Sequence, residues 1–358
     1  MGAVNIRIKK DRLHKPLVLM LMLIFSLIIL GGCAGGKKAG SKNEKVAAQR
    51  PQIEMRLAHV VQPTHPMHLA ADRFARLVEE KSQGRIKITI YPARQLGDDR
   101  ELFEQLQGGA LDMAEISAAP LAGWTPIVTA LQMPFLIESY DEWKKVMTSE
   151  AARQLLDGLS EIKVKGLAIY DAGFRHFVTL DKPVTRPQDL AGKKIRVAQS
   201  PLHIDIFKAL GAAPTPLPYG EIYSALQNRV IDGLEMDLSA ILMEKHYEVA
   251  RYVTLSRHFT WPAILLMSEK RWKSLSDEDR KIIQEAAREA VDYNLQQIKE
   301  LDARCANELR ARGVTITELP NKDLFQKTTA TVYQKYENAH PLVKQFVEYV
   351  ESQKKKGS

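Results

Sequence analysis

Apolar and polar residues alternate along the first part of the chain in a pattern that predicts strands and helices in turn. Residues 55–61 and 86–91 show the two-residue period of strands, and residues 65–82 between them show the apolar spacing of a helix. A helix over 98–107 and a third strand over 111–117 follow. Because helices separate these strands, the pattern predicts a parallel sheet with helical crossovers, and so an α/β protein.

The later elements are predicted to form a second lobe. After helices near 139–160, residues 163–173 and 193–198 have the pattern of strands, and residues 252–261 have that of a crossing between lobes. The cleft between two such lobes is the natural place for a small ligand. We expect the following division: lobe 1 at about 54–160 and 214–250, lobe 2 at about 161–213 and 251–320, and C-terminal helices to 353.

A long helix is predicted to brace the two lobes. Ser276 and Asp279 form a capping box at its start, and Gly313 ends it. Apolar residues between them, such as Ile283 and Leu301, repeat at helical spacing. A helix of this length is unusual within one compact lobe, so we expect it to span both.

The first part of the chain predicts where the protein works. A basic segment precedes the apolar run 17–30, whose 14 residues would rise about 21 Å as a helix, less than the ~30 Å of a bilayer core. Such a run favours a signal peptide over 1–32. It ends in Leu30-Gly31-Gly32-Cys33, which is typical of a lipobox with Cys33 as the lipidated residue. An uncleaved anchor with an incidental cysteine is the alternative, and both place the body outside the cytoplasmic membrane.

Charge and cysteine content narrow the classes of function. The chain carries +8 in total, of which residues 1–32 hold +4 and residues 33–50 hold +4, so the body from 51 onward is neutral. This excludes the basic surface of a nucleic-acid-binding protein. Residues 33–50 have the composition of a flexible tether. With Cys33 lipidated, Cys305 has no disulfide partner and is predicted to be a small buried apolar residue.

One arginine is placed where a ligand carboxylate would be bound. Ile195 and Val197 mark a strand, a helix with Phe207 follows, and Gly211 closes that helix. Arg196 lies at the end of the strand, and its planar guanidinium matches a carboxylate with two parallel hydrogen bonds. A structural ion pair is the other interpretation of a lone arginine.

Several segments together give a more specific interpretation. They are KSQGRIKITIYPARQLGDDRELFEQLQGGALDM (81–113), GFRHF (173–177), GKKIRV (192–197), GAAPTPLPYGEIYSALQ (211–227) and IDGLEMD (231–237). In this order they resemble the DctP-type solute-binding proteins of tripartite ATP-independent periplasmic (TRAP) transporters, and the resemblance covers about residues 54–340. It implies a two-lobed, periplasmic-binding-protein-like α/β fold with an interlobe ligand cleft and a long bracing helix.

The resemblance also implies which residues bind the ligand. The motif KKIRVAQS makes Arg196 the carboxylate clamp, and GFRHF makes Arg175 a second ligand contact. Six further residues lie at positions where relatives line the cleft. Each of them could contact the ligand or could only pack against its neighbours. These residues are Glu115, Ser117, Gln199, Tyr219, His258 and Trp261.

The chain departs from its relatives after Asp232 and Gly233. Many relatives carry Glu-Asn there, whereas this chain has Glu235 and Met236, followed by Asp237. Methionine cannot donate a hydrogen bond, so we expect a ligand that is less polar at this point than sialic acid or a uronate. The alternative is that Met236 is only a wall residue and another group donates. The sequence offers no account of Asp237.

Three histidines near the first strand raise the question of a metal site. His59, His65 and His68 straddle a strand end and a helix start, and no cysteine supports them, so we predict no metal. His59 lies at the end of the first strand and is expected to contact the ligand instead. The chain has no Walker loop, no GxGxxG run and no GxSxG elbow.

The sequence therefore predicts an extracytoplasmic, lipid-anchored, monomeric receptor without cofactor or catalytic residues. By resemblance it captures a small organic acid and delivers it to the integral-membrane subunits of an ion-gradient-driven TRAP transporter. A lipoprotein that senses the ligand for a signalling system would use the same residues. An extracytoplasmic enzyme would need a nucleophile or a paired acid and base in the cleft, and no motif indicates one.

Overall fold

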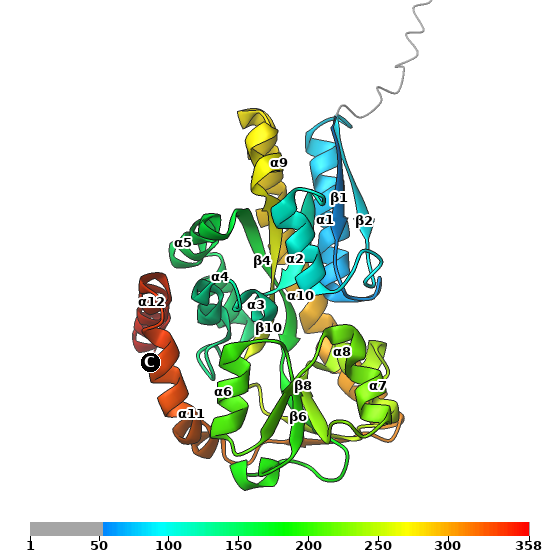
Figure 1. Ribbon diagram of the computed structural model, residues 1–358, viewed down its shortest axis with the longest axis vertical. Coiled ribbons are helices and arrows are strands. Elements are labelled where there is room, and N and C mark those ends of the chain that lie inside the picture. Colours follow the sequence, from blue (N-terminus) through cyan, green and yellow to red (C-terminus); the bar gives the residue numbers. More distant parts are fainter. Residues whose placement is uncertain (1–52, 358) are drawn as a thin grey trace, which may run out of the picture. The chain divides into compact units, whose positions relative to one another are not determined.

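The computed structural model describes residues 53–357, and the predicted signal peptide, Cys33 and the tether lie outside them. Its first sheet has the strand order β2-β1-β3-β10-β4 (Figure 1). β1 runs parallel to β2 and β3, as the alternating pattern predicted, whereas β10 is antiparallel to both β3 and β4. These strands are β1 (Ile53–Ala58), β2 (Ile86–Tyr91), β3 (Met113–Ser117), β4 (Val164–Phe174) and β10 (Thr260–Ser268).

The two crossover helices of this sheet form because their ends are capped and one face is apolar. α1 (Pro66–Lys81) starts at His65, whose side chain accepts the Met67 N–H, and it buries Phe74. α2 (Asp99–Gly108) starts at Asp98, and the Glu101 carboxylate accepts the Asp98 N–H at 2.7 Å in a capping box. Both helices were predicted from the sequence within a few residues.

The second sheet has the strand order β11-β9-β5-β8-β6-β7. Its helices α6, α7 and α8 lie with β6 and β8 in the lower part of Figure 1. The strands are β5 (His176–Thr179), β6 (Lys194–Val197), β7 (Ala213–Pro216), β8 (Gly233–Met236), β9 (Tyr252–Leu255) and β11 (Thr315–Glu318). The helices are α6 (Pro201–Ala209), α7 (Ile222–Gln227) and α8 (Leu238–Met243).

The strands are distributed between the sheets differently from the predicted lobes. β7 and β8 lie in the second sheet, although the pattern assigned 214–250 to lobe 1, and β4 and β10 lie in the first. Apolar alternation indicates a strand but not its partner. β8 fits beside β5 because residue 233 is glycine, where a Cβ would lie 2.4 Å from the Val178 carbonyl oxygen.

The chain crosses between the sheets at two adjacent places. β4 ends at Phe174 and β5 begins at His176, so Arg175 is the crossing residue. The segment between β9 and β10 is the crossing predicted within 252–261. The Arg175 N–H donates to the Phe259 carbonyl at 2.8 Å, so the two crossings lie side by side.

A single helix of 35 residues, α10 (Asp277–Ala311), packs against α1, β4 and α8. It starts as predicted, with the Ser276 hydroxyl accepting the Asp279 N–H at 3.1 Å, and Cys305 is buried along it. Within 53–357 no helix is long and apolar enough to cross a membrane. The remaining helices are α3 (Ala118–Leu121), α4 (Tyr140–Met147), α5 (Glu150–Gly158), α9 (Glu269–Ser274), α11 (Lys322–Glu337) and α12 (Pro341–Gly357). Short 3-10 helices cover Pro126–Gln132, Leu159–Ile162, Pro187–Leu190, Tyr219–Glu221 and His246–Glu248.

Candidate ligand-binding site

A small cavity lined by charged, polar and aromatic side chains lies where elements of both sheets meet. Six of the residues proposed from the sequence line it, namely Ser117, Arg175, Arg196, Gln199, Tyr219 and Trp261. They come from the end of β3, the β4–β5 crossing, β6 and the loop after it, the turn after β7, and β10. The structure therefore brings together side chains that are up to 144 residues apart, as Ser117 and Trp261 are.

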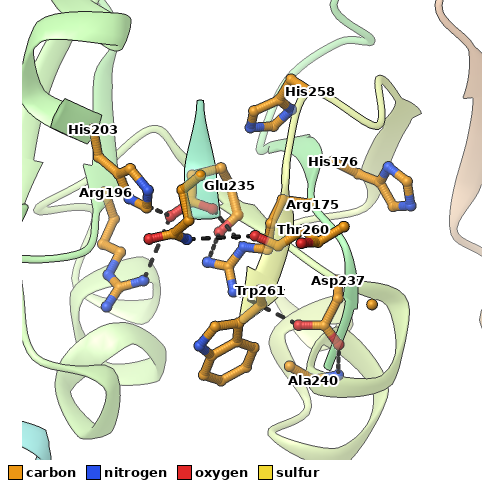
Figure 2. Close-up of polar contacts among 12 residues, drawn as sticks. Arg175, His176, Arg196, His203, Glu235, Asp237, Ala240, His258, Thr260 and Trp261 are labelled. Atoms are coloured by element: carbon orange, nitrogen blue, oxygen red, sulfur yellow. Dashed lines mark hydrogen bonds and ion pairs between the residues drawn. The ribbon is translucent and has the colours of Figure 1, made fainter. Parts of the chain in front are cut away.

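Arg175 lies among three buried partners, Glu235, Asp237 and Trp261 (Figure 2). Its Nε donates to Glu235 Oε2 at 2.5 Å, and its Nη2 donates to the Glu235 carbonyl oxygen at 2.7 Å. Its Nη1 faces Asp237 Oδ2 at 3.7 Å. The guanidinium also lies over the Trp261 ring, with Cζ 4.8 Å from the ring centroid. This set of contacts fixes both the plane and the direction of the fork.

Arg196 has a different environment, although it is equally buried. Its Nε and Nη2 both donate to the Leu217 carbonyl oxygen, at 3.1 and 2.7 Å. Its Nη1 is 3.9 Å from Glu235 Oε1, which is an ion-pair distance but too long for a hydrogen bond. Burial lowers the pKa of Arg196 to about 10, against the opposing effect of Glu235, so the side chain is charged at neutral pH.

Glu235 and His203 complete the polar floor behind the arginines. Glu235 is fully buried, and its Oε1 has no hydrogen-bond partner although it lies 4.0 Å from His203 Nδ1. His203 stacks on Phe259 with a centroid distance of 4.5 Å, and burial lowers its pKa to about 4. Because His203 is neutral at neutral pH, the cations that face Glu235 are Arg175 and Arg196.

Asp237 acquires a role that the sequence did not supply. It is the N-cap of α8, where its Oδ1 accepts the Ala240 N–H at 2.9 Å and the Ser239 hydroxyl at 2.6 Å. Its Oδ2 faces Arg175, as given above. Burial raises the pKa of this carboxyl, while Arg175 opposes that effect.

Two aromatic side chains give the cavity its flat apolar surfaces. The Trp261 Nε1–H donates to the Ser117 hydroxyl at 2.7 Å, which satisfies its polar edge. Tyr219 lies beside Trp261 with ring centroids 5.2 Å apart. Both rings are thus held in place before any ligand arrives.

Four residues proposed from the sequence lie outside the cavity lining. His59 bonds to His68 with 3.0 Å between ring nitrogens, and His258 bonds to Ser256 at 2.7 Å while stacking on Phe177. Burial lowers the pKa of His59 to about 3 and that of His258 well below its usual value.

Glu115 and Met236 are the other two residues outside the lining, and both are fully buried. Neither oxygen of Glu115 has a hydrogen-bond partner, and burial raises the pKa of this carboxyl well above its usual range. Met236 pairs with His176 across the β5–β8 ladder. Strand period alone did not distinguish which of these side chains would reach the cleft.

The lining also contains residues that sequence reasoning missed. Asp98 and Asp99 start α2, and His203 lies in the first turn of α6. Gln132 ends the 3-10 helix Pro126–Gln132, and Leu217 follows β7. Asp98 gave a usable signal, because a helix cap that follows a parallel strand lies at the carboxyl edge of the sheet. Gln132 and Leu217 carry no such signal. Among the residues of 53–357, no group of three or more histidine, cysteine or acidic side chains is placed to hold a metal ion.

Two sheets joined by crossing strands, with a pair of buried arginines in the cavity between them, define the class of two-lobed solute-binding receptors. The chain belongs to the DctP family, described as bacterial extracellular solute-binding protein, family 7, which it matches over residues 57–339. This confirms the resemblance seen in the sequence and the two-lobed α/β fold expected from it.

Individual relatives agree with this assignment. The chain is 33% identical over 326 residues to the C4-dicarboxylate-binding protein DctB of Bacillus subtilis, covering 90% of this chain and 93% of that one. A TRAP periplasmic solute-binding protein from Bradyrhizobium, in complex with galacturonate, superimposes with a TM-score of 0.81 at 31% identity, covering 84% of this chain and 99% of that one. A TRAP protein from Chromohalobacter salexigens with bound D-glucuronate gives a TM-score of 0.79 at 31% identity, with 83% and 99% covered. The protein is thus a solute-binding protein of the TRAP class.

Proposed function

We propose that this receptor binds a hydroxylated monocarboxylic acid in the interlobe cavity, with the ligand carboxylate on Arg196. The observation that carries this proposal is the position of Arg196 in the cavity lining, with its Nη1 3.9 Å from Glu235 Oε1, too far for a hydrogen bond. A ligand carboxylate that accepts from Nη1 forms a charge-assisted hydrogen bond. Arg175 supplies further positive charge while its own fork stays fixed on Glu235.

The charges around the cavity favour one carboxylate over two. The cations are Arg175 and Arg196, and the carboxyl groups of Glu235, Asp237 and Asp98 lie close to them. One ligand carboxylate can pair with Arg196, which has no hydrogen bond to a carboxylate of the protein. A second ligand carboxylate would add negative charge near these acidic groups, and no further arginine or lysine lines the described cavity. We therefore place dicarboxylates second to sugar acids.

The rest of the lining suits hydroxyl groups and an apolar ligand face. Ser117 and Gln199 offer hydrogen-bonding groups, and Tyr219 and Trp261 offer flat surfaces. Uronates bound to the relatives from Bradyrhizobium and Chromohalobacter salexigens have this chemistry. Because Met236 is buried outside the lining, the proposal assigns no ligand contact to it.

Ligand binding is proposed to stabilise the closed arrangement of the lobes, which then docks on the TRAP membrane subunits. A ligand that touches residues from both sheets binds the closed form more tightly than the open form, and this difference shifts the equilibrium. The receptor performs no chemistry on the acid. A lipid on Cys33 would keep the body near the membrane, and mass spectrometry of the mature N-terminus tests that part of the proposal separately.

A thermal-shift screen of the purified protein tests the ligand class. Gluconate, galactonate, glucuronate and galacturonate are compared with succinate, malate and fumarate, since a ligand that binds only the folded state raises Tm. We expect a sugar acid to give the largest shift and Arg196→Ala to lose it. A larger shift with a dicarboxylate would overturn the choice of ligand, and an equal shift in Arg196→Ala would overturn the site.

A further inference from the structure

A loop of the first lobe reaches across to the second lobe in an unusual backbone conformation. Ala93 and Arg94 have φ angles of 51° and 64°, in the left-handed region that non-glycine residues rarely adopt. The Ala93 N–H donates to the Val61 carbonyl at 2.9 Å, and the Arg94 N–H donates to the His59 carbonyl at 3.2 Å. The loop is therefore held in this conformation by its own lobe, which presents Arg94 to the other.

Arg94 joins the two lobes through its guanidinium. Its Nη1 donates to the Val60 carbonyl at 2.9 Å, on its own side. On the other side its Nη2 is 3.2 Å from Glu244 Oε2, and Glu244 directly follows α8. The Gln62 amide, also from the first lobe, donates to Glu244 Oε1 at 3.1 Å. Glu244 therefore binds two side chains of the first lobe, those of Arg94 and Gln62.

The same arginine holds a wall of the cavity. Its Cζ lies 5.4 Å from the centroid of the Tyr219 ring, which lines the ligand cavity. Beside Tyr219, the Gly220 N–H donates to Asp98 Oδ2 at 3.1 Å. A Cβ at Gly220 would lie 3.1 Å from Arg94 Cδ, so glycine allows this close approach.

We propose that Arg94 is a positioning residue, which fastens the lobes in the closed form through Glu244 and fixes Tyr219 against the ligand. It touches no ligand in this arrangement, because it lies behind Tyr219 and outside the lining. All its partners across the cleft belong to the second lobe, so opening separates them together. The inference deepens the proposed function by naming what sets the lifetime of the closed receptor.

The two side chains retain little solvent contact, with exposed fractions of 25% for Arg94 and 14% for Glu244. Such a pair is screened less than a surface salt bridge, and it adds the stacking on Tyr219. We therefore expect its loss to speed opening by roughly 5- to 10-fold. Closing should change little, because the contacts form only once the lobes meet.

Single-molecule fluorescence energy transfer on the full, ligand-free protein tests this directly. Dyes are placed through unnatural amino acids at the exposed positions Glu104 in α2 and Lys208 in α6. Arg94→Ala and Glu244→Gln should each open faster, and the double variant no faster than Arg94→Ala alone. Arg100→Ala is the matched control, because Arg100 stacks on Trp124 at 4.7 Å within the first lobe.

Each outcome decides the matter without a ligand. Opening rates in Arg94→Ala equal to those of the unaltered protein would overturn the proposal, as would a ligand-free protein that never closes. Additive effects in the double variant would show that Arg94 and Glu244 act separately. If sugar acids then fail to bind while the opening rates change as expected, the proposed ligand is wrong and the fastening role of Arg94 stands.

Discussion

Arg175 and Arg196 are equally buried in one cavity, yet their surroundings differ in kind. Arg175 donates to both a side-chain and a main-chain oxygen of Glu235, faces Asp237 and lies over Trp261. Arg196 makes its hydrogen bonds to one carbonyl, that of Leu217, and keeps Nη1 at 3.9 Å from the nearest carboxylate. Neither Nη1 is within hydrogen-bond distance of a carboxylate, but Arg175 faces two carboxylates, one of them hydrogen-bonded, whereas Arg196 has a single carboxylate at ion-pair distance. We therefore propose that Arg175 mainly stabilises the fold and that Arg196 is the more available of the two for an anion.

The difference follows from where the two residues lie in the chain. Arg175 is the crossing residue between β4 and β5, so its guanidinium has neighbours from β8 and β10 as well. Arg196 lies in β6 between β8 and the edge strand β7, and its guanidinium donates to the Leu217 carbonyl just after β7. We therefore propose that Arg175 at the crossing point has a mainly structural role and that Arg196 beside β7 is the residue that binds the ligand carboxylate.

The largest effect expected from this comparison is the loss of stability in Arg175→Ala. It leaves Glu235 buried without a cation in hydrogen-bond contact, and breaking a buried pair in this way costs about 3–5 kcal/mol. Urea unfolding followed by circular dichroism measures the change. Adding Glu235→Gln should recover part of the loss, because the uncompensated charge is removed. A loss below about 1 kcal/mol would show that Arg196 can replace Arg175 as the partner of Glu235.

Arg196→Ala should show the opposite profile. Its unfolding free energy should change by about 1 kcal/mol or less, because it removes bonds to one carbonyl and also removes a buried charge. The affinity for the sugar acid should fall on the order of 100-fold, or about 3 kcal/mol. Titration calorimetry measures it. Arg196→Lys should recover only part of the affinity, since it keeps the charge but loses the fork. Full recovery by lysine would show that the charge alone binds the ligand and that the guanidinium geometry does not matter.

His203, which lies behind the two arginines, should make the stability of the protein depend on pH. An unfolded histidine has a pKa near 6.5, whereas burial lowers the pKa of His203 to about 4. Below pH 6.5 the unfolded chain therefore takes up a proton that the folded protein refuses, and stability falls as pH drops toward 4. Between pH 7.5 and pH 5, His203 should account for a loss of about 2 kcal/mol in the free energy of unfolding. In urea unfolding at both values, His203→Phe should lose less stability than the parent by that amount. An equal loss would mean that His203 is protonated beside Glu235 in the folded state.

The sequence predicted more of the fold than of the site. The Ser276 cap, the helix over 98–107 and the parallel strands 55–61 and 86–91 depend on local residues, and all were correct within a few positions. The membership of β8 in the second sheet depends on a contact with β5, more than 50 residues away, so the local pattern did not reveal it.

Within the site, the arginines were found through their motifs, but their different roles were not. Those roles depend on Glu235, Asp237 and Leu217, whose side chains or carbonyls meet the arginines only after the sheets have formed. Burial misled the choice of Glu115 for the same reason. It lies two residues before the cavity residue Ser117 in β3, on the same side of the strand, but beneath the lining rather than in it.

The smallest effect is expected for Asp237, which both caps α8 and faces Arg175. As the N-cap of α8 it holds the Ala240 N–H, and replacing such a cap by alanine costs about 1 kcal/mol. Asparagine also caps helices well, so Asp237→Asn should cost less than Asp237→Ala if the cap is the main role. If instead the charge facing Arg175 at 3.7 Å dominates, both variants should lose the same stability, because both remove that charge. Urea unfolding of the two variants separates these cases.

The affinity for the sugar acid should be nearly unchanged in both variants, because Asp237 faces Arg175 and not Arg196. A marked change in affinity would mean that Arg175 shifts when Asp237 is altered, and the division of roles between the two arginines would then be less complete than their hydrogen bonds indicate.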